Sequence, residues 1–131
     1  MENYRKIYAD YYGIEWDSQL FEIHHINRNR NDNNIYNLVL LPKKLHKEYH
    51  KIINIIQFDF ETVADVFNVS NYDIYHASEY QELIKIKFDI ANIILFQSQI
   101  KIFCDNYKTN NFAKLLQFCY YDIYKKYIGG K

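Results

Sequence analysis

The sequence predicts an α+β fold that is mainly helical, with a small core of two short antiparallel strands and a helix supported by N- and C-terminal helices. Apolar residues recur at helical spacing through most of the chain beyond residue 43. Two short apolar segments, 20–26 and 38–41, flank an asparagine-rich stretch, which is the pattern of a hairpin. With 131 residues, 49% apolar, three glycines and one proline, the chain is not collagen-like, proline-rich or wholly disordered.

The N-terminal part is expected to form a helix, a strand and an ordered loop. Residues 2–12 place four apolar side chains on one helical face, and Gly13 is suited to end the helix. These side chains are Tyr4, Ile7, Tyr8 and Tyr11. The strand 20–26 leads into the loop 27–37, where asparagines and Asp32 favour turns held by side-chain to backbone hydrogen bonds.

The second strand and the next helix meet at Pro42. Residues 38–41 form a short apolar run, and Pro42 closes it and suits the first turn of a helix. Residues 43–56 then carry apolar side chains at helical spacing. The sequence therefore predicts a strand, loop, strand and helix in immediate succession.

The remainder of the chain is expected to be helical. One amphipathic turn pair consists of Phe60, Val63, Val66 and Phe67. Residues 78–104 contain a stretch that alternates like a strand, but their length and lack of Gly or Pro favour one helix. Residues 111–127 form a further helix, capped by Asn110 or Asn111 and ended by Gly129 and Gly130.

Composition also limits the compartment and the class of protein. Cys104 and Cys119 form no C-x-x-C pair, so neither a disulfide framework nor a cysteine zinc ribbon is expected. The N-terminus lacks the apolar core of a signal peptide, and the longest near-apolar stretch, 90–96, is too short to span a bilayer. We expect a single cytoplasmic domain, residues 1–131, with no membrane partner.

Basic residues gather between residues 24 and 51. This window holds six basic and two acidic residues, a local net charge of +4 in a chain whose total is zero. The six are Arg28, Arg30, Lys43, Lys44, Lys47 and Lys51. Such a window focuses positive potential at one place on a neutral protein. A solvated loop and helix face is the alternative explanation.

Four of the five histidines fall in the same window. His46 and His50 are four residues apart on the predicted helix, so their side chains project from one face and can hold one metal ion. A third ligand would come from His24 or His25 at the end of the first strand. Since adjacent strand residues point to opposite faces, one of this pair ligates and the other is left for a different task.

Such a site has the ingredients for hydrolysis of a phosphate ester. Three histidine ligands leave one coordination position open, as in catalytic metal sites. Histidine is also the side chain that ordinarily exchanges protons near neutral pH, so the remaining imidazole can deprotonate a water. The metal ion would stabilise the charge that develops at phosphorus and on the leaving oxygen.

The stretch E-I-H-H-I-N-R-N-R-N-D-N-N-I-Y-N-L-V-L-L-P-K-K-L-H-K-E-Y-H resembles the motif of the HNH endonucleases, a family with a ββα-metal core. The family pattern is H-H-I-D-G-x-R-x-N-N, then N-L-x-x-L, then a histidine and often another one helical turn later. The resemblance covers about residues 20–53, and Tyr12-Gly13-Ile14 is also family-like. It depends on two histidines, an asparagine and two further histidines at set offsets, which makes it specific.

The resemblance implies a role for each matching residue. His25 corresponds to the general base, His24 to the first metal ligand and His46 to the closing ligand on the helix. His50 matches an extra ligand that some members possess. Asn37 matches the middle N of the family name, and the resemblance implies that it bonds backbone across the loop and holds His25 in place.

Basic residues would bind the nucleic acid. Arg30 lies where many members have an arginine that can hold a phosphate through two hydrogen bonds. Arg28 stands where members often have glycine, and Asn27 replaces a common aspartate. Lys43 and Lys47, with Lys51, share one face of the predicted helix and would line the phosphate path. Exposed solubilising lysines are the alternative.

The resemblance implies an HNH endonuclease with one divalent ion, Zn, Ni, Mn or Mg, that hydrolyses phosphodiester bonds in DNA rather than RNA. Residues 12–56 would form the core and residues 57–131 a helical extension that replaces the structural zinc of other members. This extension could also carry a homodimer or protein-partner contact. A phage or bacterial setting would suit such a protein. The alternative function is a non-cleaving, metal-stabilised module that binds nucleic acid or protein.

Overall fold

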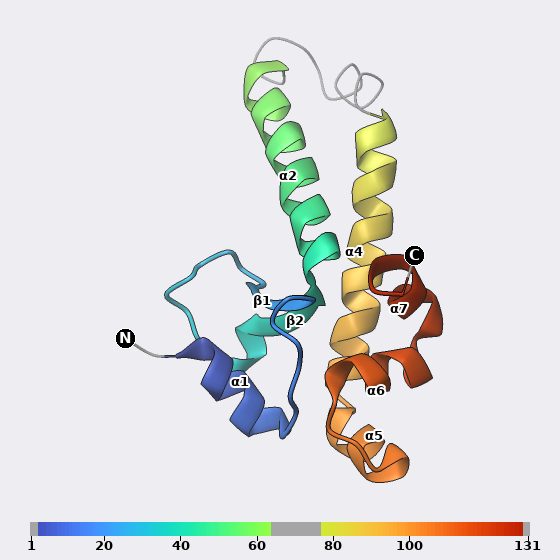
Figure 1. Cartoon of the computed structure of the whole chain (residues 1–131). Coiled ribbons are helices and arrows are strands. Elements are labelled where there is room, and N and C mark those ends of the chain that lie inside the picture. Colours follow the sequence, from blue (N-terminus) through green and yellow to red (C-terminus); the bar gives the residue numbers. More distant parts are fainter. Residues whose placement is uncertain (1–2, 64–76, 130–131) are drawn as a thin grey trace.

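The computed structural model of the chain describes residues 3–63 and 77–129. Its elements, in chain order, are α1 (Tyr4–Tyr12), β1 (Phe21–His25), the 3₁₀ turn η1 (Ile35–Asn37), β2 (Leu38–Pro42), α2 (Lys43–Val63), α4 (Ala77–Gln97), α5 (Ile100–Tyr107), α6 (Phe112–Cys119) and α7 (Tyr121–Tyr127). The two strands form one antiparallel sheet, while α2 and α4 run side by side (Figure 1). The α+β, mainly helical class is confirmed.

Helix α1 begins and ends at capping residues. The Asn3 side chain accepts hydrogen bonds from two backbone N–H groups of the first turn, so the helix begins at Tyr4 rather than at residue 2. Gly13 ends it in the left-handed conformation, with φ of 66°, as expected. On the predicted apolar face Tyr8 is fully buried, but Tyr11 is exposed.

The hairpin pairs Phe21 with Pro42 at one end and His25 with Leu38 at the other. Pro42 is therefore the last residue of β2, and the expectation that it lies in the first turn of the helix is wrong. Helix α2 begins at Lys43, whose backbone N–H donates to the Leu20 carbonyl at 2.9 Å. The strand thus runs directly into the helix, which fixes α2 against the hairpin.

Side-chain oxygens of four residues order the loop between the strands. Four Asx turns follow one another, each with a side-chain oxygen that accepts from the backbone N–H two residues later. The accepting residues are Asn27, Asn29, Asp32 and Asn34. This is the ordered, non-helical loop that the asparagine content predicts, apart from the single turn η1 at its end.

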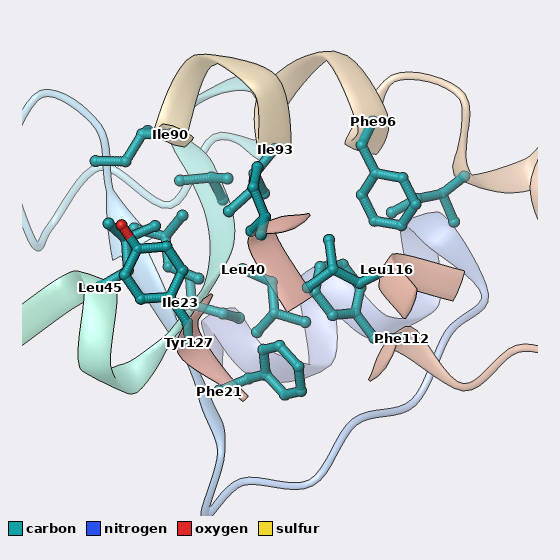
Figure 2. Packing of buried hydrophobic residues seen from close by; sticks show 14 of the residues in the cluster. Phe21, Ile23, Leu40, Leu45, Ile90, Ile93, Phe96, Phe112, Leu116 and Tyr127 are labelled. Atoms are coloured by element: carbon teal, nitrogen blue, oxygen red, sulfur yellow. The ribbon is translucent and has the colours of Figure 1, made fainter. Parts of the chain in front are cut away.

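One hydrophobic core joins the hairpin to the C-terminal helices. Figure 2 shows Ile90, Ile93 and Phe96 of α4 facing Leu40 of β2 and Leu116 of α6. The four core residues of β2, 38–41, are completely buried. A strand with side chains buried on both faces needs cover on both faces, and α4 covers one of them. The C-terminal helices are thus part of the hairpin's support.

The helix expected over residues 78–104 is interrupted after Gln97, giving α4 and α5. The Ser98 hydroxyl donates to the Leu95 carbonyl at 2.7 Å, which competes with the helical hydrogen bonds at this turn. The turn buries Ile100 completely and stacks Phe103 on Phe96, with ring centroids 5.6 Å apart. Tertiary packing therefore breaks a helix that contains no Gly or Pro.

The helix expected over residues 111–127 is also divided, into α6 and α7. Asn111 caps α6 as expected, with its side chain accepting from the Lys114 N–H at 3.0 Å. The division falls at Tyr120, whose φ of −138° and ψ of 67° are not helical. Its ring packs on Phe96, and the new direction buries Ile123 and Tyr127.

Helix α2 is longer than expected, since it extends to Val63, seven residues beyond the predicted end. The side chains of the predicted pair at 60–67 lie outside the described residues. Both cysteines are free and half-buried. No described helix is long and apolar enough to cross a membrane.

We expect the Gln97→Leu substitution to lower the free energy of unfolding by about 1–3 kcal/mol. Gln97 is buried, accepts from the Tyr8 hydroxyl and donates to the Leu38 carbonyl at 3.0 Å, so leucine leaves buried polar groups without their partner. Urea denaturation would measure the loss. Gln117→Leu, the same change at an exposed position on α6, is the control, and an equal effect in both variants would contradict this account.

Candidate metal centre

Three imidazoles meet where the end of β1 lies against the first turns of α2. His46 and His50 stand one helical turn apart on α2, and β1 supplies His24. His46 Nε2 lies 3.1 Å from His24 Nδ1 and 2.9 Å from His50 Nε2. All three candidate ligand atoms lie within 4.8 Å of one another. Nitrogens bound to one zinc ion are separated by roughly 3.3 Å, so this set could close on a metal ion with small movements.

The hydrogen bonding of His46 favours a cation at this point. His46 Nδ1 lies 2.6 Å from Glu22 Oε1, so Nδ1 carries the proton and donates to the carboxylate. Nε2 of the neutral ring then has a single lone pair, yet two other imidazole nitrogens face it. One lone pair serves two donors poorly, whereas a metal ion takes one lone pair from each ring. The Glu22 carboxylate behind His46 is the partner that metal-ligating histidines commonly have.

Burial keeps the candidate ligands in the form that binds metal. His24 is 4% exposed, and burial, followed by the charges of His46 and His50, lowers its pKa from 6.5 to about 4. The pKa of His50 is lowered as well, first by burial and then by His46. Neutral imidazole has the lone pair that a ligand needs, so His24 and His50 compete little with protons at neutral pH.

The metal-free protein should lose stability as the pH falls from about 6.5 to 4. In the unfolded chain His24 takes up a proton near ~6.5, while in the folded protein it does so only near 4. Within that window the unfolded state binds more protons, so its share of the population grows. Melting temperatures recorded in EDTA across this range would show the slope. His24→Gln should make the slope shallower, with the remainder due to His50, and an unchanged slope in that variant would contradict the assignment.

The histidines open into a pocket of about 290 Å³. Its lining residues are Tyr4, Ile23, His24, His25, Arg28, Arg30, His46 and His50. His25 lines this pocket but does not join the cluster of three, because its Nε2 lies 2.9 Å from Asn33 Oδ1 in the loop. An amide oxygen only accepts, so Nε2–H is the donor and Nδ1 keeps the lone pair. The edge of the Tyr4 ring packs against His25, with centroids 5.1 Å apart.

Asn37 fastens the two ends of the loop that carries these groups. Its side-chain oxygen accepts from the Asn27 N–H at 2.9 Å, and its amide donates to the Asp32 carbonyl at 2.8 Å. Its own carbonyl accepts from the Ile26 N–H, at 2.8 Å, immediately after His25. Asn37 is not among the residues that line the pocket. The hydrogen bonds across the loop that the resemblance implies for Asn37 are present.

The basic residues fall into two groups. Arg28 and Arg30 line the histidine pocket, whereas Lys43 and Lys47 are exposed on α2 outside it. Arg28 has a φ of 63°, the left-handed conformation that glycine adopts most easily. The loop thus retains here the backbone that a glycine would give. The two arginines add positive charge to the histidine pocket.

Sequence reasoning missed three residues of this site: Glu22, Asn33 and Tyr4. A signal for Glu22 existed, since residues two apart on a strand share a face and His24 was a candidate ligand. Asn33 is one of several loop asparagines, and nothing in the sequence distinguishes it from the others. Tyr4 lies on the N-terminal helix, and its approach to His25 depends on how α1 packs.

Replacing Glu22 by glutamine should weaken metal binding by about 10- to 100-fold, the usual effect of losing a carboxylate behind a ligating histidine. The substitution keeps the shape and removes the charge that orients the His46 ring. Competition with a chromogenic chelator would measure the affinity. Glu48→Gln, on the same helix as His46, is the matched control, and equal affinities in the two variants would rule out this role for Glu22.

The hairpin, helix α2 and the histidine cluster together form a ββα unit whose three histidines could hold a metal ion. Residues 5–47 match the family model described as HNH endonuclease. This match confirms the resemblance of this segment to the HNH endonucleases. It indicates a nuclease-type function that acts on nucleic acid. No curated protein and no solved structure gives a match to the chain.

Proposed function

We propose that the protein is a metal-dependent endonuclease that hydrolyses phosphodiester bonds in DNA. The observation that carries the proposal is that the four histidines of one pocket have two different arrangements. Three of them converge on a single point, while His25 is oriented separately by Asn33. A purely structural metal site has no use for a separately held imidazole beside its ligands.

His25 is the proposed general base. Its Nδ1 takes a proton from water as the water oxygen forms a bond to phosphorus, and its Nε2–H stays bonded to Asn33. The phosphorus–oxygen bond to the leaving group breaks on the opposite side, and the leaving oxygen takes a proton from solvent. Asn37 keeps the loop closed behind His25, so it is a positioning residue.

His24, His46 and His50 would hold one divalent ion, Zn, Ni, Mn or Mg. When bound, such an ion stabilises the negative charge that develops on the phosphate and the leaving oxygen. Arg28 and Arg30 would orient the phosphate in the same pocket, and Lys43 and Lys47 would attract the DNA along α2. The imidazole donor set suits Zn or Ni better than Mg.

We further propose that the chain is one domain, with residues 12–56 as the catalytic core and residues 57–131 as its helical support. The shared hydrophobic core supports this arrangement, since α4 and α6 pack on the hairpin. A contact with a second copy or a protein partner through the C-terminal helices stays a prediction, as does a cytoplasmic location in a phage or bacterial setting.

The test is cleavage of supercoiled plasmid by the purified protein, with EDTA or with Mg, Mn, Ni or Zn added. Nicking or linearisation that depends on metal would support the endonuclease. A single-stranded RNA of similar length would show which nucleic acid is preferred. Stoichiometric metal binding without cleavage of either substrate would instead favour the non-cleaving binding module.

A further inference from the structure

A second pocket, of about 330 Å³, lies beside the loop that positions His25. Among its lining residues are Tyr11, Ile26, Tyr36, Gln99 and Lys101. They come from the end of α1, the two ends of the hairpin loop, and the turn between α4 and α5. None of these residues belongs to the histidine pocket. The proposed mechanism does not use this second pocket.

We propose that this pocket binds a nucleobase of a single-stranded stretch of the substrate; the inference rests on the proposed function. Tyr36 has 82% of its surface exposed and Tyr11 46%, so two aromatic rings at the pocket meet water instead of packing in the core. Exposed aromatic rings are the platforms on which proteins stack bases of single-stranded nucleic acid.

The charge of the pocket fits a nucleotide. Lys101 is the charged residue among the described lining residues, and they include no carboxylate. Its Nζ lies 5.0 Å from the centre of the Tyr11 ring, so a cation stands beside an aromatic face. A base stacked on a tyrosine would bring its phosphate near this ammonium. A polar, uncharged group is also present in Gln99, whose side chain makes no capping hydrogen bond to α5.

The position of the second pocket relative to His25 favours an extended nucleic-acid strand as the ligand. Ile26 directly follows His25, and Tyr36 directly precedes Asn37, so one loop borders both pockets. Consecutive Cα atoms are about 3.8 Å apart, so the backbone of Ile26 in the second pocket lies next to that of His25 in the first. A nucleic-acid strand that crosses this loop would reach both pockets. Bases paired in an intact duplex are stacked and closed to such a pocket.

The test compares binding of two fluorescent twelve-nucleotide strands, oligo(dT) and an abasic strand of equal length. Anisotropy is read with metal present in the His25→Ala background, and strand integrity is checked on a gel. The His25→Ala protein should bind oligo(dT) about 5- to 100-fold more tightly than the abasic strand. Adding Tyr36→Ala should remove this difference, whereas Tyr36→Phe should keep it because the ring remains.

Two further variants make the outcome specific. Tyr121→Ala, at another exposed tyrosine that lies outside the pocket, should leave the base preference unchanged. Lys101→Gln should lower the salt dependence of oligo(dT) binding by about 0.7 in the slope of log K against log salt, the value for one phosphate. Equal binding of both strands by the parent, or a preference that survives Tyr36→Ala, would overturn the proposal.

This result is independent of the nuclease test. If the protein cleaves plasmid but shows no base preference, the base-pocket proposal is wrong and the proposed function is unaffected. If it prefers oligo(dT) through Tyr36 but cleaves no nucleic acid with any metal, the endonuclease proposal is wrong and the base pocket is supported.

Discussion

Replacing His25 with alanine should reduce plasmid cleavage by about 10²- to 10⁴-fold, the usual contribution of a general base, and leave one metal ion bound per chain. The reason is geometric. His25 lines the pocket but stands apart from the three converging imidazoles, held by Asn33 at 2.9 Å. Its removal takes away the proton acceptor and none of the candidate ligands. Initial rates of nicking and metal content of the same preparation are the two measurements.

Two comparisons make this result specific to the base. Asn33→Ala should lower the rate by a smaller factor, because the imidazole remains but loses the partner that fixes its Nε2 proton. Lys44→Ala, at an exposed position on α2, should cleave as the wild type does. If His25→Ala cleaves at the wild-type rate, or if it loses its metal, His25 is not the base that we propose.

The local parts of this fold could be predicted from the sequence because their causes are local. Gly13 ends α1 with a positive φ, and the Asx turns of the loop each need only a side chain and the backbone two residues later. The spacing of His46 and His50 places both on one face of any helix there. These features depend on a few neighbouring residues, so their pattern is visible in the chain itself.

The features that depend on contacts distant in sequence were not predictable. The division between α4 and α5 follows from burying Ile100 and stacking Phe103 on Phe96, and no Gly or Pro marks it. Asn33 holds His25 across eight residues of loop, but the loop contains several equivalent asparagines. The histidine cluster, in contrast, could be predicted, because its members belong to elements that follow one another in the chain. The hairpin register and the direct join of β2 to α2 bring these elements together.

Replacing His46 with alanine should abolish metal binding and cleavage together. His46 is the central member of the cluster, since its Nε2 lies within 3.1 Å of the facing nitrogen of both His24 and His50. Losing a carboxylate behind such a ligand already costs about 10- to 100-fold in affinity, so losing the ligand itself should cost more than 100-fold. Metal content after dialysis and the plasmid assay would both be measured.

The neighbouring Lys47→Ala variant separates loss of the ligand from damage to the helix. Lys47 is exposed and does not line the histidine pocket, so this variant should keep one metal ion per chain and lose only part of its salt-sensitive DNA binding. Far-ultraviolet circular dichroism would establish that both proteins retain α2. Full metal occupancy in a folded His46→Ala protein would remove His46 from the ligand set. Because the hydrogen bond of Glu22 within the cluster is to His46, the Glu22→Gln effect on metal affinity should then become smaller as well.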